Sequence, residues 1–429
     1  MSRVSRADAV VVVVGAGHAG VQVADSLCEG GYHGPVLLLG DEPGLPYQRP
    51  PLSKDVLSAR DEPGLLPLRG ERHFADRGID YRPDAVVTGI DRARRTVLLA
   101  SGQEIGYASL VLATGAAPRP LQVEGSERAG VLPLRSLADA RALRAALQSA
   151  RTAVVVGAGF IGLEFAAAAR KRGVDVAVFE SGDRVLARAV SVGTSLHIMQ
   201  VHRAMGTTVL VGEGPVRLEG AGGADGAVRA VVGSRGSRHP ADLVVVGIGV
   251  RPRDDLARGC GLAVDDGVVV DEHLRTTDPA IFAVGDCARF PSPAGPLHRL
   301  ESVQNATAQA RHVARVILGA GTAAYVELPW FWSVQGPVTL QIAGLAVADD
   351  ESVTSGYPDG GGFSVLRFRG DRLIAVESVN RPADHAAARR VLAGTERPTA
   401  AQAAAPGFCL KEHAGRAVAA VRRPHGLAG

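Results

Sequence analysis

The chain has 429 residues, 46% hydrophobic and 21% charged, a balance that excludes a disordered or fibrous protein and suggests about three domains of roughly 150 residues. The net charge is +3 without a basic cluster, so nothing specific supports nucleic-acid binding, and no apolar run reaches the roughly 18 residues of a membrane helix. The four scattered cysteines form no Cys-x-x-Cys pair, which argues against a disulfide framework, a zinc site or an iron–sulfur cluster and favours a cytoplasmic location. The 53 glycines are an excess that a globular fold must explain.

The N-terminal segment predicts a strand, a phosphate-binding turn and a helix. A valine run over Ala9–Val14 reads as a buried parallel strand, Val21–Leu27 as a helix and Val36–Leu39 as the next strand. Between the first strand and the helix stands a Gly-x-Gly-x-x-Gly motif, whose glycines permit a tight turn, approach of a pyrophosphate and close helix–strand packing. Asp41, 21 residues after the motif, can accept hydrogen bonds from an adenosine ribose. The motif supplies Gly15, Gly17, Ala19 and Gly20 as candidate binding residues.

The same pattern recurs 142 residues later and predicts an internal duplication. Thr152–Val156 is a second valine strand, Leu163–Arg172 a helix and Val174–Phe179 the following strand, after which Glu180 takes the place of the ribose-binding acid. The second motif supplies Gly157, Gly159, Phe160, Ile161 and Gly162. Two such motifs, each between a strand and a helix, are far more specific than one.

Further strands complete the two units, and the residues at their ends indicate which cofactor each unit binds. Leu110–Ala113 ends at Thr114-Gly115, Leu243–Val246 ends near Gly249, and Ile281–Val284 ends at Gly285-Asp286. A carboxylate at Asp286 can bond the ribityl hydroxyls of a flavin, which NAD lacks. The first unit is therefore expected to bind FAD and the second a nicotinamide dinucleotide.

The last hundred residues change character. Alternation over Phe363–Phe368 and Leu373–Val376 predicts antiparallel strands in a small α+β domain. We interpret Ala400–Pro406 as a linker before a final helix from about Cys409. The expected fold is α/β, with two Rossmann-like dinucleotide-binding domains on the glutathione-reductase plan and this C-terminal domain. The predicted boundaries are residues 1–116 and 246–325 (FAD), 117–245 (NAD) and 326–429.

Several motifs resemble the ferredoxin reductases of bacterial oxygenase systems almost from end to end. The Arg-Pro-Pro-Leu-Ser-Lys motif at 49–54 and the Pro-Trp-Phe-Trp-Ser motif at 329–333 are specific to that group among flavoproteins with two dinucleotide sites. Other matching stretches are residues 110–115, 157–164, 283–290, 301–303 and 379–382. One departure is Val334, where relatives usually carry Asp, and this difference bears on local hydrogen bonding and partner docking.

The resemblance implies roles for individual residues. Lys54, one of only three lysines, matches a lysine near flavin N5 and O4, and Glu164 matches a glutamate beside the flavin that can pair with it. A helix over about Gln304–Leu318 would point its N-terminus at the flavin and stabilise its reduced form. Other implied FAD contacts are Arg49, Val87, Ala113, Thr114, Gly115, Arg135, Gly285, Val303 and Trp330; Arg188 would contact NAD.

Glu180 bears on the choice of nicotinamide cofactor. Its carboxylate accepts from a free 2′-hydroxyl and repels a 2′-phosphate, so NADH is favoured over NADPH. Because Asp41–Leu57 contains no cysteine, disulfide-reductase chemistry is excluded, and Cys287 is expected to be a small buried hydrophobe.

The expected function is NADH-dependent reduction of a 2Fe–2S ferredoxin that feeds a haem monooxygenase or a ring-hydroxylating dioxygenase, by a monomer or weak dimer. Ferredoxins are acidic, and we expect docking at Arg311 and Arg389. The alternatives are a rubredoxin reductase, an NADH oxidase, or a non-catalytic NADH-binding flavoprotein sensor. Turnover with ferredoxin, background oxygen consumption and the rate of flavin reduction distinguish them.

Overall fold

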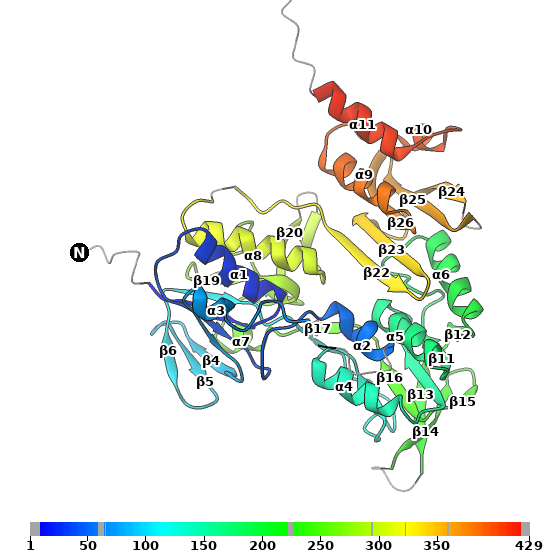
Figure 1. Ribbon diagram of the computed structural model, residues 1–429, viewed down its shortest axis with the longest axis horizontal. Helices are drawn as coiled ribbons and strands as arrows, with labels where there is room; N and C mark the ends of the chain where they lie inside the picture. Colours follow the sequence, from blue (N-terminus) through cyan, green and yellow to red (C-terminus); the bar gives the residue numbers. More distant parts are fainter. Residues whose placement is uncertain are drawn as a thin grey trace, which may run out of the picture. The chain divides into compact units, whose positions relative to one another are not determined.

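The computed structural model (Figure 1) describes residues 9–58, 64, 66–221, 226–292, 295–321, 323–357 and 360–421. The chain divides into two units. Unit 1 comprises Met1–Arg49, Gly64–Ala117 and Val250–Glu327, and unit 2 comprises Pro50–Pro63, Pro118–Gly249 and Leu328–Gly429.

Unit 1 is built on a parallel sheet in the order β19-β7-β1-β2-β3. Its central strand β1 (Val11–Val14) is buried along its whole length, as the valine run predicts, and pairs in parallel with β2 (Val36–Leu39) and β7 (Ser109–Leu112). The outer strands are β3 (Ile79–Arg82) and β19 (Ile281–Ala283). Helix α1 (His18–Glu29) follows β1 directly, as in a Rossmann unit.

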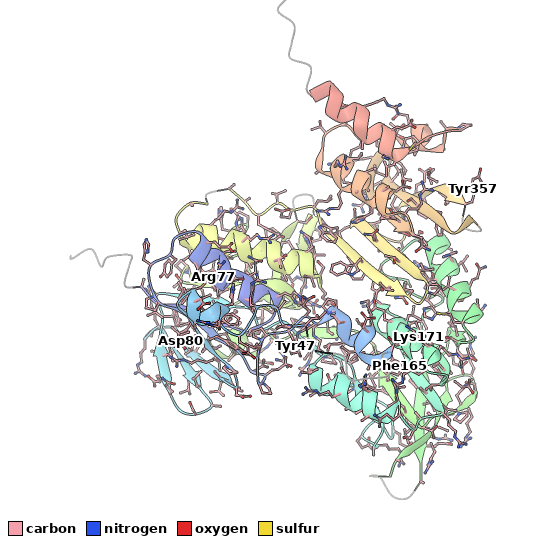
Figure 2. All side chains as sticks on the ribbon, in the orientation of Figure 1. Tyr47, Arg77, Asp80, Phe165, Lys171 and Tyr357 are labelled. Carbon is pink, nitrogen blue, oxygen red and sulfur yellow. The ribbon has the colours of Figure 1, made fainter. Side chains whose placement is uncertain are left out.

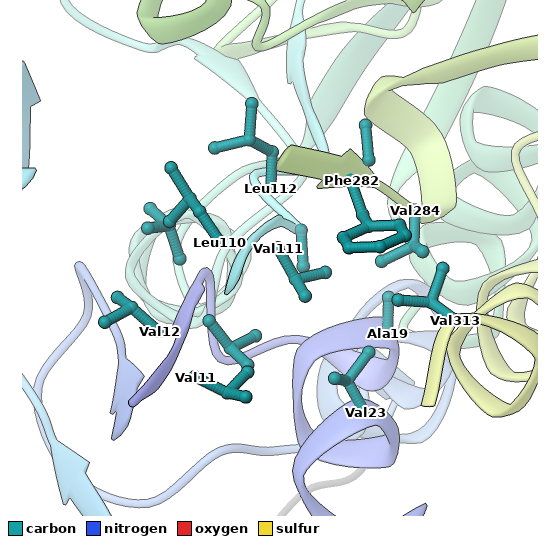
Figure 3. Packing of buried hydrophobic residues seen from close by; sticks show 14 of the residues in the cluster. Val11, Val12, Ala19, Val23, Leu110, Val111, Leu112, Phe282, Val284 and Val313 are labelled. Carbon is teal, nitrogen blue, oxygen red and sulfur yellow. The ribbon is translucent and has the colours of Figure 1, made fainter. Parts of the chain in front are cut away.

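The core of unit 1 joins this sheet to two helices (Figure 3). Val11, Leu110 and Phe282 come from three of its strands and pack with Val23 of α1 and Val313 of α8 (Val303–Ile317). Each of these side chains is at most 3% exposed. An antiparallel sheet, β4 (Val87–Asp91), β5 (Thr96–Leu99) and β6 (Glu104–Gly106), adds to the unit. Its remaining elements are α3 (His73–Asp76), β17 (Val250–Pro252), α7 (Asp255–Gly259), β18 (Val268–Val269), η3 (Gly285–Cys287), β20 (Ala288–Ser292) and β21 (Gly295–His298), and β8 (Ala116–Pro118) lies at the boundary between the units.

Unit 2 contains a second parallel sheet in the order β12-β11-β10-β16-β9. Here β10 (Thr152–Val156) is the central strand, α5 (Phe160–Lys171) follows it, and β11 (Asp175–Glu180) is its parallel neighbour. The strand–glycine turn–helix pattern is therefore repeated, as predicted. The other elements here are η2 (Pro50–Ser53), α2 (Asp55–Ser58), β9 (Val131–Pro133), α4 (Leu137–Ala146), α6 (Val192–Ala204), β12 (Thr208–Val211), β13 (Pro215–Gly220), β14 (Val228–Gly233), β15 (Arg238–Pro240) and β16 (Leu243–Val246).

The C-terminal part of unit 2 is an antiparallel sheet in the order β22-β23-β26-β25-β24, with helices α9, α10 and α11 (Figure 1). Its long strands β25 and β26 include the two alternating segments that the sequence predicts. The bounds are β22 (Trp330–Gln335), β23 (Val338–Gly344), β24 (Glu351–Tyr357), β25 (Gly362–Arg369), β26 (Arg372–Val379), α9 (Pro382–Ala393), α10 (Ala400–Ala404) and α11 (Leu410–Val421).

The predicted linker over Ala400–Pro406 is wrong, because α10 forms there. Thr399 accepts a hydrogen bond from the backbone N–H of Gln402, whose side chain accepts in return from the N–H of Thr399. This reciprocal capping box starts a helix in an alanine-rich segment, and burial of Ala403 in the C-terminal core holds it in place.

These elements confirm the predicted fold class: two Rossmann-like units and a C-terminal α+β region. The domain boundaries at 116, 245 and 325 stay a prediction. Among the helices that the structure describes, none is long and apolar enough to cross a membrane.

Candidate dinucleotide-binding sites

The first glycine motif forms a turn in which neighbouring backbone leaves no room for a side chain at two positions. Gly15 has φ +108°, and a Cβ on it would overlap the carbonyl of Ala113; a Cβ on Gly20 would overlap the carbonyl of Gly15. Gly17 differs, because a Cβ there would meet no described atom within 4 Å. The protein therefore needs glycine at Gly15 and Gly20 for its own packing, whereas at Gly17 the absent side chain leaves space beside the N-terminus of α1.

The C-terminal ends of β7 and β19 bring other predicted FAD residues to this end of the sheet. Thr114 and Gly115 follow β7, and the Thr114 hydroxyl donates to the carbonyl of Arg253 at 2.6 Å. Gly285, at φ +75°, follows β19, and its N–H donates to Gln309 on α8 at 2.7 Å. Asp286 is next in the η3 turn, and its carbonyl accepts from Arg299 at 3.2 Å.

Asp41, just after the end of β2, has a charged partner. Its carboxylate pairs with Arg253 at 2.5 Å, and both side chains are partly exposed. The next residue, Glu42, pairs with Arg49 at 2.5 Å and also accepts from the hydroxyl of Tyr47. Burial lowers the pKa of Arg49, but Tyr47 and Glu42 outweigh it and leave the pKa above its usual value. The segment that follows β2 thus carries two carboxylates, each paired with an arginine.

The second glycine motif repeats the geometry of the first. Gly157 has φ +100°, and a Cβ on it would lie 2.5 Å from the carbonyl of Gly247; a Cβ on Gly162 would overlap the carbonyl of Gly157. A Cβ on Gly159 would meet only that Gly247 carbonyl, at an ordinary 3.8 Å. The middle glycine again leaves space at a helix N-terminus, and the first turn of α5 carries no acidic residue to oppose an anion.

Glu180 has different partners from Asp41. One of its oxygens accepts from the N–H of Ala158, within the glycine turn, and the other from the N–H of Gly182, each at 2.8 Å. The carboxylate is thus fixed beside the turn by neutral donors and not by an arginine. A Cβ on Gly249, at φ +94°, would lie 3.6 Å from the guanidinium of Arg188, so these two residues are also neighbours.

Lys54 and Glu164 form an ion pair at 2.9 Å, as the resemblance implies. Glu164 lies in the first half of α5, which can be found in Figure 2 by Phe165 and Lys171, and its side chain is 3% exposed against 19% for that of Lys54. Lys54 follows the η2 turn and also donates to the carbonyl of Pro50 at 3.1 Å. Sequence reasoning missed the neighbouring Ser53, whose hydroxyl donates to Glu164.

Two more partners of this pair come from β22. The Ser333 hydroxyl donates to Glu164 at 2.5 Å, and the N–H of Val334 lies 3.3 Å from the same oxygen. Gln335 donates to Ser333 and contacts His202 of α6. The motif around Ser333 pointed to this strand, but His202 is 133 residues from Gln335 and carries no sequence signal.

Other predicted residues take varied places. In unit 1, Val87 begins β4, Val303 begins α8, and Arg311 on α8 is exposed, with one nitrogen 3.5 Å from Gln22. In unit 2, the backbone N–H of Arg135 donates to Asp139 near the start of α4. The Arg389 guanidinium lies 4.4 Å above the ring of Trp330, which is also near Trp332.

The helix expected over about Gln304–Leu318 is α8, which begins after a Ser302 cap. All four cysteines lie in described parts of the chain and are free. Cys287 is fully buried, as expected, and burial raises the pKa of its thiol.

Comparison with known proteins agrees with this geometry. Residues 9–310 match the pyridine nucleotide-disulphide oxidoreductase family, and residues 330–414 match the reductase C-terminal family. Rhodocoxin reductase from Rhodococcus erythropolis is 47% identical over 404 residues, which cover 94% of this chain and 93% of that protein. The chain belongs to the ferredoxin reductases of this oxidoreductase family.

Two solved structures of ferredoxin reductases share the whole fold. The ferredoxin reductase for the CYP199A2 system from Rhodopseudomonas palustris has a TM-score of 0.91 at 44% identity, covering 95% of this chain and 100% of that one. The covalent putidaredoxin reductase–putidaredoxin complex has a TM-score of 0.89 at 38% identity, covering 96% of this chain and 99% of that one.

Proposed function

We propose that this ferredoxin reductase binds FAD in the cradle of unit 1, accepts NADH in the cradle of unit 2, and passes electrons singly to a 2Fe–2S ferredoxin. The observation that carries the proposal is the presence of two dinucleotide cradles in a chain whose four cysteines are free and form no redox pair. Electrons that enter such a protein from a dinucleotide need an acceptor other than a protein disulfide.

The residues of unit 1 fit FAD. The space beside Gly17 and the uncapped start of α1 suit a pyrophosphate, and Asp41 and Asp286 offer carboxylates for ribose and ribityl hydroxyls. Further contacts of this proposal are Gly15, Ala19, Gly20, Arg49, Val87, Ala113, Thr114, Gly115, Gly285 and Val303 from unit 1 and Lys54, Arg135 and Trp330 from unit 2.

FAD, when bound, supplies the step from two-electron to one-electron chemistry. The protein contributes binding and charge. Lys54 places a cation that favours negative charge on the reduced cofactor, and Glu164 fixes Lys54 through their 2.9 Å ion pair. Lys54 and Glu164 are therefore the proposed catalytic pair.

The nicotinamide dinucleotide is held by the second motif in this proposal. The N-terminus of α5 receives the pyrophosphate, with Gly157, Gly159, Phe160, Ile161 and Gly162 around it. Glu180 accepts from the adenosine ribose, because each of its oxygens uses one lone pair on a backbone N–H and retains another. Arg188 and Gly249 complete the site, and the free 2′-hydroxyl of NADH is preferred to the phosphate of NADPH.

The proposed partner is an acidic 2Fe–2S ferredoxin that feeds a haem monooxygenase or a ring-hydroxylating dioxygenase. Two named relatives, rhodocoxin reductase and the reductase in complex with putidaredoxin, support this class of partner. Arg311 and Arg389 are exposed cations suited to dock it. A monomer or weak dimer and, from the free thiols, a cytoplasmic location belong to the same proposal.

The experiment is reduction of the FAD-containing enzyme by NADH and by NADPH in a stopped-flow instrument, followed by steady-state turnover with a 2Fe–2S ferredoxin. Fast reduction and turnover with ferredoxin well above oxygen consumption support the proposal. Slow reduction with a long-lived charge-transfer band would indicate a sensor. Turnover only with oxygen would indicate an NADH oxidase.

The docking face is tested by Arg311→Glu. We expect a higher KM for ferredoxin and unchanged ferricyanide reduction, because ferricyanide needs no protein docking face. An unchanged KM for ferredoxin would remove Arg311 from the docking face.

A further inference from the structure

Glu164 is a buried carboxylate surrounded by donors. Lys54 and Ser53 reach one of its oxygens, and Ser333 and the N–H of Val334 reach the other. The residue is 4% exposed and Ser333 is fully buried, so water does not compete for these positions. The orientation of the carboxylate therefore depends on how its protein donors are themselves held.

A row of side chains behind Ser333 fixes the direction of its hydroxyl proton. The amide nitrogen of Gln335 lies 2.7 Å from the Ser333 hydroxyl and 3.4 Å from the carbonyl of Phe160. A carbonyl only accepts, so the amide NH₂ faces this side and donates to both. The Ser333 oxygen thus accepts from Gln335, which leaves its own proton for Glu164.

His202 completes the row from helix α6. Its Nε2 lies 3.0 Å from the amide oxygen of Gln335, which can only accept, so Nε2 carries the proton. Nδ1 is buried and has no hydrogen-bond partner among the described residues. Burial lowers the pKa of His202, with the hydrogen bond to Gln335 partly opposing this, so the ring is neutral.

The hydrogen bonds run in one direction, from His202 to Gln335 to Ser333 to Glu164. His202 and Gln335 are both completely buried and come from elements far apart in the chain. Bonds aligned in this way polarise one another and end on a negative charge, the arrangement in which such a row stabilises most.

We propose that His202 and Gln335 are positioning residues that set the orientation of Glu164, and through it that of Lys54, by forcing the Ser333 hydroxyl to donate. The role assigned to Lys54 rests on the proposed function. Without the row, Ser333 can rotate away, the Lys54–Glu164 pair is less well fixed, and the cation is held less closely at the place where reduction adds negative charge.

The test compares His202→Met with His202→Gln in the FAD-containing enzyme. Met matches the size of the ring but cannot donate, whereas the amide nitrogen of Gln extends to about the position of Nε2. For His202→Met we expect flavin reduction by NADH to slow about fivefold, the equivalent of one net hydrogen bond, and the flavin midpoint potential to become more negative. For His202→Gln we expect both values to stay close to wild type.

The matched control is His197→Met on the same helix. His197 packs its ring edge-on against Phe363, so this variant removes a partly buried histidine without touching the row. It should leave the rate and the potential unchanged. If the role of His202 is merely structural, both His202 variants will melt at a lower temperature, and neither will change the flavin potential or the rate of flavin reduction selectively. That result would overturn the proposal. Equal rates of flavin reduction in His202→Met and His202→Gln would also overturn it.

If His202→Met yields no flavin-bound protein, Gln335→Met tests the same row and should give the same slower reduction and more negative potential. The potential is measured by chemical reduction against a reference dye and needs neither NADH nor ferredoxin. An enzyme that reduces no ferredoxin would therefore refute the proposed function and still leave the row testable. An unchanged potential in both Met variants would refute the row alone.

Discussion

The acidic residues that follow the two glycine motifs occupy equivalent positions but have different partners. Asp41 pairs with the charged Arg253, whereas Glu180 is held by two backbone N–H groups. In the proposed function, a ribose that binds at Asp41 has to share or displace Arg253, whereas the backbone donors of Glu180 remain in place. The charge of Glu180 is thus not neutralised by an arginine in the described part of the chain, and we expect it to distinguish NADH from NADPH.

Glu180→Gln tests that discrimination. The amide keeps the shape but loses the charge, so we expect kcat/KM for NADH to fall about tenfold and the preference over NADPH to narrow. The two cofactors are compared in steady-state assays with ferricyanide. Asp41→Asn is the matched control from the other cradle and should leave the ratio unchanged. An unaltered ratio in Glu180→Gln would show that another group selects the cofactor.

The three glycines of the first motif differ in what a methyl group would do. Gly20→Ala drives a Cβ into the carbonyl of Gly15, and we expect a loss of about 1–3 kcal/mol in unfolding free energy. Gly17→Ala meets no described atom, so the fold should persist while the bound flavin falls sharply. Thermal melts and the flavin-to-protein absorbance ratio report the two effects. Full flavin content in Gly17→Ala would contradict the cradle.

At the scale of elements, hydrophobic period and glycine position predict most of both parallel sheets. The sequence predicts strand β10, Thr152–Val156, to the residue, because a buried strand between turns has clear ends. Helix α1 begins at His18, three residues before the prediction, since the last half of a glycine motif is already helical. The Lys54–Glu164 pair could be anticipated only by resemblance. The His202–Gln335 contact could not, because it depends on the packing of a helix against a distant strand.

Helix α10 shows how a cap decides whether an alanine-rich segment is helical. Thr399→Ala removes the acceptor for the N–H of Gln402, at 3.2 Å, and we expect a loss of about 1 kcal/mol that is confined to α10. Hydrogen exchange should become faster in Ala400–Ala404, while the long α9 is unaffected. Ser136→Ala, which removes the capping box of α4, is the matched control and should leave exchange in α10 unchanged.

At the scale of the whole molecule, a buried ion pair joins the C-terminal sheet to α6 within unit 2. Arg367 and Glu377 lie on neighbouring strands at 2.8 Å, 2% and 1% exposed, and Glu377 also accepts from the N–H and hydroxyl of Ser191 at the start of α6. This helix is thus tied to the sheet near both ends, by Ser191–Glu377 and by His202–Gln335.

Breaking the Arg367–Glu377 pair should destabilise the C-terminal sheet and α6 together. Arg367→Met leaves a buried carboxylate without its charge partner, and we expect a loss of about 3–5 kcal/mol. The double variant Arg367→Met, Glu377→Gln removes both charges and should recover a substantial part of the lost unfolding free energy. Urea unfolding followed by circular dichroism measures this. Equal losses in the single and double variants would mean that the charge pair is not the cause.

Three buried histidines are expected to make the unfolding free energy fall at acidic pH. Burial lowers the pKa of His202, and burial with the charge of a nearby arginine, Arg315 or Arg389, lowers the pKa of His312 and His385 to about 4. These groups charge near 6.5 when unfolded, so the stability they provide is complete above 6.5 and is lost as the pH falls toward 4. The urea midpoint should drop between pH 7 and pH 5. His385→Met should flatten this drop, whereas His33→Gln on the surface should not.

The sheet of unit 1 has a consequence for synthesis on the ribosome. Its edge strand β19 pairs with β7, yet about 170 residues separate them in the chain. All strands of the second parallel sheet lie between Val131 and Val246, so that sheet can be complete while β19 is still to be translated. The parallel sheet that begins first is therefore completed last, and a nascent chain carries an unpaired β7 edge until Ile281–Ala283 emerges. The sheet that carries the first glycine motif is thus the later of the two parallel sheets to be completed during synthesis.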